Sequence, residues 1–117
     1  MKRWEIFCAV PKGTDLNNAE PILRDLARVT GGYTLLRSTG GWIDDGGKLV
    51  TDTSFVVVTW GTEVEAAIET ACSRLRARFN QDCVIALATD ATNVLHVYPT
   101  RKTGGINKDV VRNPRIG

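Results

Sequence analysis

The residues best suited to chemistry in this sequence lie between Arg37 and Phe55, in the stretch RSTGGWIDDGGKLVTDTSF. Two glycine pairs flank a tryptophan and two adjacent aspartates, and a lysine follows the second pair. Glycine-rich loops of the G-x-x-x-x-G-K-[ST] type bind phosphate where they lead directly into a helix. Here Lys48 leads into a strand-like segment and no serine or threonine follows it, so the stretch does not fit a nucleotide-cleaving loop.

The aspartates of this stretch allow two interpretations. Asp44, Asp45 and Asp52 offer oxygen ligands of the kind that magnesium prefers, but their spacing fits no known cation loop. The Asp-Gly pair is typical of a tight turn between antiparallel strands, where glycine takes a positive φ. We therefore predict a β-hairpin without a metal, in which Gly40-Gly41 forms a bulge or lets another backbone approach.

Other candidate catalytic groups are sparse. His96 is the single histidine and has no carboxylate beside it in sequence. Cys8 and Cys83 lie in strand-like segments and fit buried, inert thiols better than nucleophiles. The odd cysteine count and the absence of C-x-x-C spacing argue against a disulfide framework and a zinc site. We predict no catalytic residue, no metal and no cofactor.

The elements that must position these residues follow from the apolar periodicity. Strands are expected at residues 2–10, 33–39, 48–60 and 82–90, helices within 14–32 and 62–79, and a further strand at 93–99. Asn17 or Asn18 is expected to cap the first helix, and Thr62 and Glu65 have capping-box spacing for the second. This order predicts the α+β class: a ferredoxin-like β-α-β-β-α-β sandwich (1–98) with an extra C-terminal strand and a basic tail (99–117).

Composition and charge narrow the classes of function. The 117 residues, 43% apolar and 24% charged, are typical of one globular domain. No apolar run approaches the roughly 20 residues of a membrane span, and the apolar start is too short for a secretion signal, so we expect a cytoplasmic protein. The body has an acidic excess, which argues against nucleic acid. The tail has a basic excess that suggests an anionic partner or an acidic neighbouring subunit, and its charges are Arg101, Lys102, Lys108, Arg112 and Arg115 against Asp109.

Both faces of the predicted sheet are apolar. In the first strand Trp4 and Ile6 fall on one face and Phe7 on the other, and in the third strand Phe55 and Val56 likewise fall on opposite faces. Two helices cover only one face of such a sheet, and the second would be an unusually large apolar patch for a monomer. The pattern predicts self-association, or coverage by the chain's own C-terminal strand and tail.

The chain resembles a family of small bacterial and phage proteins with this fold. The resemblance rests on the hairpin GGWIDDGGKLVTDTSFVVVTW, with its Gly-x-Trp turn and acidic-Gly tip, and on the following helix end RLRARFNQDCVIALATD, with its Arg-x-x-Phe-x-Gln element. It covers roughly residues 2 to 90 and implies the ferredoxin-like fold. It implies no catalytic residues, and the tail lies outside it.

These observations favour a non-enzymatic homo-oligomer that holds a small anionic, nucleotide-like ligand at a subunit interface. Basic residues would meet the charge and tryptophan would stack on a ring; the expected ligand-binding residues are Arg37, Trp42, Lys48, Trp60, Arg101 and Lys102. By analogy with compact phage proteins, the ligand would be a nucleotide signal of host immunity that the protein sequesters. The alternatives are a dimeric enzyme of the oxygenase or isomerase type, with His96 or Asp90 as base, and a structural module that binds a protein partner.

Overall fold

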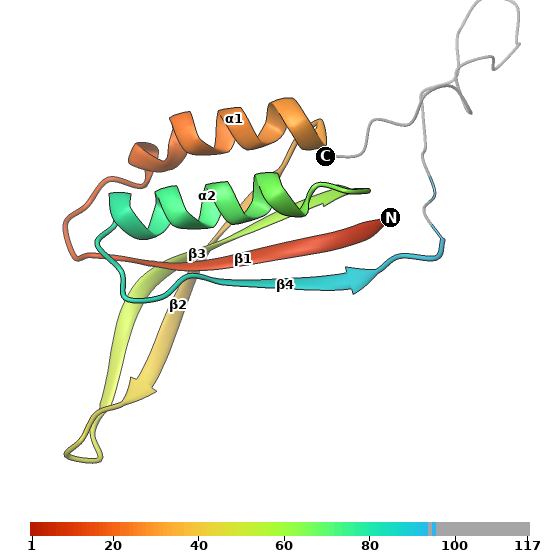
Figure 1. The fold of residues 1–117 in the computed structure, drawn as a ribbon. Coiled ribbons are helices and arrows are strands. Elements are labelled where there is room, and N and C mark those ends of the chain that lie inside the picture. The colour runs from red at the N-terminus through yellow and green to blue at the C-terminus, as the bar shows by residue number, and fades with distance from the viewer. Residues whose placement is uncertain (94, 96–117) are drawn as a thin grey trace, which may run out of the picture.

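The computed structural model describes residues 1–93 and 95. It contains strands β1 (Lys2–Val10), β2 (Thr34–Ile43), β3 (Leu49–Gly61) and β4 (Ile85–Asp90), helices α1 (Glu20–Thr30) and α2 (Glu65–Arg78), and a 3-10 turn, η1 (Leu16–Ala19), before α1. The strands form one antiparallel sheet in the order β2-β3-β1-β4, and both helices lie on the same side of it (Figure 1). The predicted α+β, ferredoxin-like order is therefore confirmed. Of the strand expected at 93–99 the structure describes only residues 93 and 95, and His96 and the basic tail lie outside the described residues.

Local signals place the helices, but not through the caps expected from the sequence. Asp15 caps η1, because its Oδ1 accepts the Asn17 N–H at 2.9 Å, and α1 then begins after Ala19 without a side-chain cap. Gly31, at φ 99°, ends α1 in the left-handed conformation that favours glycine. The capping box expected at α2 is absent, since its N-cap residue is Val64 and makes no side-chain hydrogen bond. Both cap predictions were wrong by a few residues.

The core lies between the helices and one face of the sheet. Phe55 of β3 meets Phe79, at the end of α2, edge to face with ring centroids 5.6 Å apart. Thr59 is fully buried, and its Oγ1 donates to the Gly32 carbonyl at 2.7 Å. The buried apolar residues are Trp4, Ile6, Cys8, Val10, Leu16, Ala19, Ile22, Leu23, Leu26, Phe55, Val57, Val64, Ile68, Ala71, Leu75 and Phe79. Cys8 is buried as expected, but Cys83 precedes β4 and is exposed, so the expectation of a buried Cys83 was wrong.

The hairpin predicted from the Asp-Gly signal joins β2 to β3. Asp44 Oδ1 accepts the backbone N–H groups of Gly46 and Lys48, both at 2.9 Å, and Gly47 has the positive φ (79°) that the turn requires. Asp44 is therefore a turn-forming residue. The register runs without a bulge through Gly40 and Gly41, so the bulge interpretation was wrong.

The β2–β3 hairpin extends past the end of β1. The last residue pair between β1 and β3 joins Val10 to Thr53, whereas β2 and β3 remain paired as far as Ile43 and Leu49. Residues 40–52, which we call the arm, thus pair only with each other among the described strands. Figure 1 shows the arm projecting away from the helices.

Candidate functional site

The sheet face that is turned away from the helices, which we call the open face, carries exposed apolar side chains. Strand alternation places them there, because the residues on either side of each one in its strand face the helix-bearing side. Leu36, Trp42 and Leu87 are each at least half exposed. The large apolar residues exposed on this face are Phe7, Leu36, Trp42, Ile85 and Leu87. A surface of this composition is typical of a site that another molecule covers.

An arginine lies over an aromatic ring at the β1–β3 end of the open face. Arg3 and Trp60 are cross-strand partners, and the Arg3 guanidinium lies 5.5 Å from the Trp60 ring centroid. Its Nε is 3.4 Å from Glu5 Oε2 but is buried without a well-aligned hydrogen bond in the described part of the chain. The Arg3 side chain as a whole is partly exposed and presents a cation next to an apolar surface, which suits a planar or anionic group.

A strip of polar side chains crosses the open face where the arm begins. Ser38 Oγ and Ser54 Oγ are 2.8 Å apart and share a hydrogen bond. Asp52 is the cross-strand partner of Gly40, and its Oδ1 lies 2.6 Å from the point that a Cβ on Gly40 would occupy. Trp42 is the next residue on this face of β2. The absence of a side chain at Gly40 therefore lets the Asp52 carboxylate lie across β2, beside an exposed indole.

The chemistry available at this strip is recognition of a polar ring system. Asp52 makes no hydrogen bond or ion pair with any described residue, so its oxygens are free to accept from hydroxyl or amine groups. The Ser38–Ser54 pair shares one of its two protons internally and has one left to donate. Trp42, about half exposed, offers a flat apolar face on which a ring can stack.

The structure separates the ligand-binding residues expected from the sequence. Trp42 and Trp60 both lie on the open face, but ten residues of β3, about 33 Å of extended chain, separate Trp60 from the partner of Trp42. Arg37 pairs with the core residue Phe55 and so belongs to the helix-bearing side, and Lys48 lies in the turn at the tip of the arm. One copy of the chain does not bring these four residues together. Arg101 and Lys102 lie outside the described residues.

The sequence analysis missed the functional potential of Ser38, Gly40 and Ser54 and considered Asp52 only as a metal ligand. A signal for them was present. With the turn centred on Asp45–Gly47, paired residues are found by counting outwards from the tip, and this places Gly40 opposite Asp52 and Ser38 opposite Ser54. Strand alternation then places all four on the face that carries Trp42.

Asp90, the candidate base of the enzyme alternative, is exposed at the end of β4. It lines a cavity of about 310 Å³ together with Trp4, Glu63 and Glu65. Three of its nine lining residues are acidic, and Lys2 adds a positive charge. His96, the other candidate base, lies outside the described residues. Among the described residues, no helix has both the length and the apolar character needed to cross a membrane.

Comparison with known proteins gives structural neighbours only. No protein-family model matches the chain. No curated protein matches it either. A phage SAM lyase solved in complex with S-methyl-5'-thioadenosine is similar with a TM-score of 0.59 and 17% identity, over 76% of this chain and 80% of the lyase.

Two CutA proteins are similar to the same extent. CutA from Xylella fastidiosa has a TM-score of 0.55 and 28% identity, over 80% of this chain and 86% of that protein. CutA1 from Pyrococcus horikoshii has a TM-score of 0.56 and 17% identity, with the same coverage. The resemblance to small bacterial and phage proteins therefore holds at the level of the fold, while the hairpin and helix-end motifs stay predictions. The chain has the ferredoxin-like fold that CutA proteins and a phage SAM lyase also have.

Proposed function

We propose that the protein is a non-enzymatic homo-oligomer that binds a small nucleotide-like molecule where the open faces of its subunits meet. The observation that carries this proposal is the composition of the open face. Exposed apolar side chains surround two polar groups, the Arg3–Glu5 pair and the Asp52 strip, which have unused hydrogen-bonding capacity. A mostly apolar lining with a small number of polar groups is typical of ligand sites.

Two features support self-association. The open face exposes large apolar side chains of β1, β2 and β4, and monomeric proteins rarely leave a contiguous apolar patch of more than a few hundred Å² uncovered. The arm is an isolated two-stranded ribbon, a structure that is only marginally stable in water. It has exposed apolar side chains on both sides, Trp42 on the open face and Ile43 and Leu49 on the other. A second copy packed against the arm would bury them.

The ligand class follows from the two polar groups. The Asp52 carboxylate suits the paired hydroxyls of a ribose, and Trp42 suits a base stacked beside them. Arg3, held over Trp60, suits a phosphate. Because these groups lie at opposite ends of one copy, a single ligand would meet both only if the Arg3 end of one subunit approached the arm of another. The phage lyase with this fold was solved with a nucleoside, S-methyl-5'-thioadenosine, which supports this choice.

The biological role in this proposal is sequestration: a phage protein that withholds a nucleotide signal of host immunity without turning it over. The cysteines form no disulfide in the described part of the chain, which fits a reducing cytoplasm. The second candidate is an enzyme acting on the same ligand class. It is favoured by one observation, that a lyase of S-adenosylmethionine has this fold.

One experiment separates these candidates. The purified full chain is examined by native mass spectrometry and by thermal shift with ADP-ribose, cyclic nucleotides, S-methyl-5'-thioadenosine and S-adenosylmethionine. The proposal expects an oligomer, a rise in melting temperature with at least one nucleotide, and recovery of that nucleotide unchanged. Conversion of S-adenosylmethionine would establish the enzyme. A monomer whose melting temperature no nucleotide changes would refute both.

A further inference from the structure

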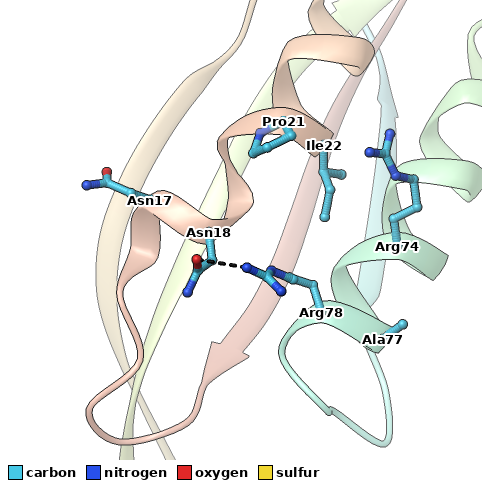
Figure 2. Close-up of a pocket in the computed structure, with 7 residues that line it drawn as sticks. All are labelled: Asn17, Asn18, Pro21, Ile22, Arg74, Ala77 and Arg78. Atoms are coloured by element: carbon cyan, nitrogen blue, oxygen red, sulfur yellow. Dashed lines mark hydrogen bonds between the residues drawn. The ribbon is translucent and has the colours of Figure 1, made fainter.

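The groove between α1 and α2 contains a second candidate site, which involves no residue of the open face. A shallow cavity of about 600 Å³ opens between the start of α1 and the end of α2. A second cavity of about 390 Å³ continues it along the two helices, and Ile22 and Arg74 line both. Figure 2 shows Asn18, Pro21 and Ile22 on one side of the first cavity and Arg74, Ala77 and Arg78 on the other.

Arg78 is held at this cavity by a neutral partner. Its Nη2 donates to Asn18 Oδ1 at 2.9 Å, the contact drawn in Figure 2. No carboxylate of the described residues lies within 4.0 Å of it, whereas Arg74 is paired with Asp25 at 2.7 Å. A guanidinium has five N–H donors in a fixed plane. Arg78 therefore has one hydrogen bond that directs it toward Asn18, a full positive charge and several unused donors.

The side-chain amide of Asn18 adds to the donors at this point. Since its oxygen accepts from Arg78, its NH₂ group is left to donate. Asn17 also lines the cavity, but its side chain points away from α2 in Figure 2. The groups that converge on the cavity from Asn18 and Arg78 thus match a partner that only accepts hydrogen bonds.

The two helix ends beside the cavity have opposite effects on an anion. The carbonyls of Leu75, Arg76 and Ala77, in the last turn of α2, each accept a backbone N–H of residues 79–81. These carbonyls are therefore hydrogen-bonded within the chain, although the C-terminal end of the α2 dipole remains negative. The start of α1 has no side-chain cap, and its dipole is positive here.

We propose that this cavity binds a small organic anion, a phosphate or carboxylate carried on an apolar or ring-shaped body. Arg78 and Asn18 meet the anionic group, and Pro21, Ile22 and Ala77 form the apolar wall for the body. The cavity volume lies within the range of small-molecule sites, roughly 300–1,000 Å³. The site is formed by one copy of the chain and does not depend on the function proposed for the open face.

The test uses the ¹⁵N-labelled full chain titrated with phenyl phosphate, benzoate and benzyl alcohol, followed by NMR. Both anions are expected to shift the Arg78 Nε–H and the Asn18 side-chain amide, while the neutral alcohol leaves them in place. The anion that binds with the higher affinity in the titration identifies the preferred head group, phosphate or carboxylate. Equal shifts with benzyl alcohol, or no shift of these signals with either anion, would overturn the proposal.

A matched pair of variants tests the arginine. Arg78→Gln is expected to weaken phenyl phosphate binding by about tenfold or more, the usual effect of losing one charge-assisted hydrogen bond. Arg76→Gln removes a charge from the same turn of α2 at an exposed position that does not line the cavity, and should leave affinity within about twofold. If both variants bind alike, the cavity is not an anion site. If Arg78 only joins the helices, Arg78→Gln lowers the melting temperature with unchanged affinity, which also refutes the proposal.

Discussion

Arg74 and Asp25 join the two helices across their groove. Arg74 Nη1 donates a hydrogen bond to Asp25 Oδ2 at 2.7 Å. The other oxygen of this carboxylate, Oδ1, accepts a hydrogen bond from Arg28 Nη1 at 3.3 Å. The Arg74 hydrogen bond, followed by the charges of Arg74, Arg28 and Arg24, lowers the pKa of Asp25 below its usual range. The carboxylate thus contributes to stability only while it is ionised.

The first prediction concerns the pH dependence of this contact. Because the pKa of Asp25 is lowered in the folded protein, its contribution is complete above the unfolded carboxyl pKa of about 3.9 and is lost as pH falls through the lower folded value. Urea midpoints measured at pH 3 to 6 should therefore differ most between the natural protein and Asp25→Asn at pH 6, and the difference should shrink as the pH falls below about 3.9. Glu69→Gln, at an exposed α2 position without an ion pair in the described region, is the control. A constant difference across the range would contradict the assignment.

The second prediction tests the open face as the interface between subunits. Leu87 is 53% exposed on β4, and Val29 is 58% exposed on α1, in the other layer. Leu87→Glu places a carboxylate in the apolar face directly opposite Glu5, so it should dissociate the oligomer. Val29→Glu should leave it intact. Light scattering after size-exclusion chromatography measures both, and an unchanged mass for Leu87→Glu would exclude this face.

The third prediction concerns the polar strip at the start of the arm. A Cβ on Gly40 would lie 2.6 Å from Asp52 Oδ1, so Gly40→Ala must displace the carboxylate, while the backbone can stay as it is. Binding of the best nucleotide ligand should weaken by about tenfold, the effect of one charged hydrogen bond, with little change in melting temperature.

Gly41→Ala is the matched control for the strip. A Cβ there would meet Leu49 Cδ1 at 3.4 Å, which is close to an ordinary contact, on the opposite face of the arm. Its ligand affinity should equal that of the natural protein in calorimetry. If the two alanine variants bind the ligand equally well, Asp52 has no part in recognition.

The fourth prediction concerns the partly buried carbonyl of Gly32. It accepts from Thr59 Oγ1 at 2.7 Å and from Thr30 Oγ1 at 3.0 Å. Thr59→Val should lower the free energy of unfolding by about 1 kcal/mol, since one donor remains. The double variant with Thr30→Val should lose more than the sum of the single variants, because the carbonyl is then left without a side-chain donor. Additive losses in chemical denaturation would show that the two hydroxyls act separately.

The fifth prediction concerns thiol reactivity. Burial, reinforced by the neighbouring Cys72, raises the pKa of the Cys8 thiol to about 11, and burial with nearby Glu69 raises the pKa of Cys72. At pH 8 a disulfide reagent should therefore label exposed Cys83 rapidly and the other two only on unfolding. Cys83→Ser should remove the rapid phase. A rapid phase that persists in that variant would mean that Cys8 or Cys72 is accessible in the native protein.

The sequence predicted the layers of this protein well because they depend on periodicity. β1 and β3 have apolar residues at alternate positions, and α1 has one apolar stripe. Few folds other than this one are compatible with that periodicity in two βαβ units. The caps were harder to place, because Asp15, Asn17 and Asn18 all have suitable side chains within four residues. Which of them caps is decided by the 3-10 turn that precedes α1.

The candidate site was predicted less well because composition alone does not give register. Arg37 and Trp42 looked equivalent as ligand residues, yet the pairing of Arg37 with Phe55 puts it on the helix-bearing side. The sequence analysis considered Asp52 and Asp44 together as metal ligands. In the structure Asp44 accepts hydrogen bonds within the turn, and Asp52 is the cross-strand partner of Gly40. A shift of one residue in the register would have exchanged every one of these positions.

The pairing of residues 40–52 only with each other has a consequence for how this protein can change over generations. Substitutions, or a lengthened tip, in that segment alter no side chain of the cluster that contains Phe55 and Phe79. The choice of ligand or partner bound by residues 40–52 can therefore change by substitution while the core, and with it the fold, is retained.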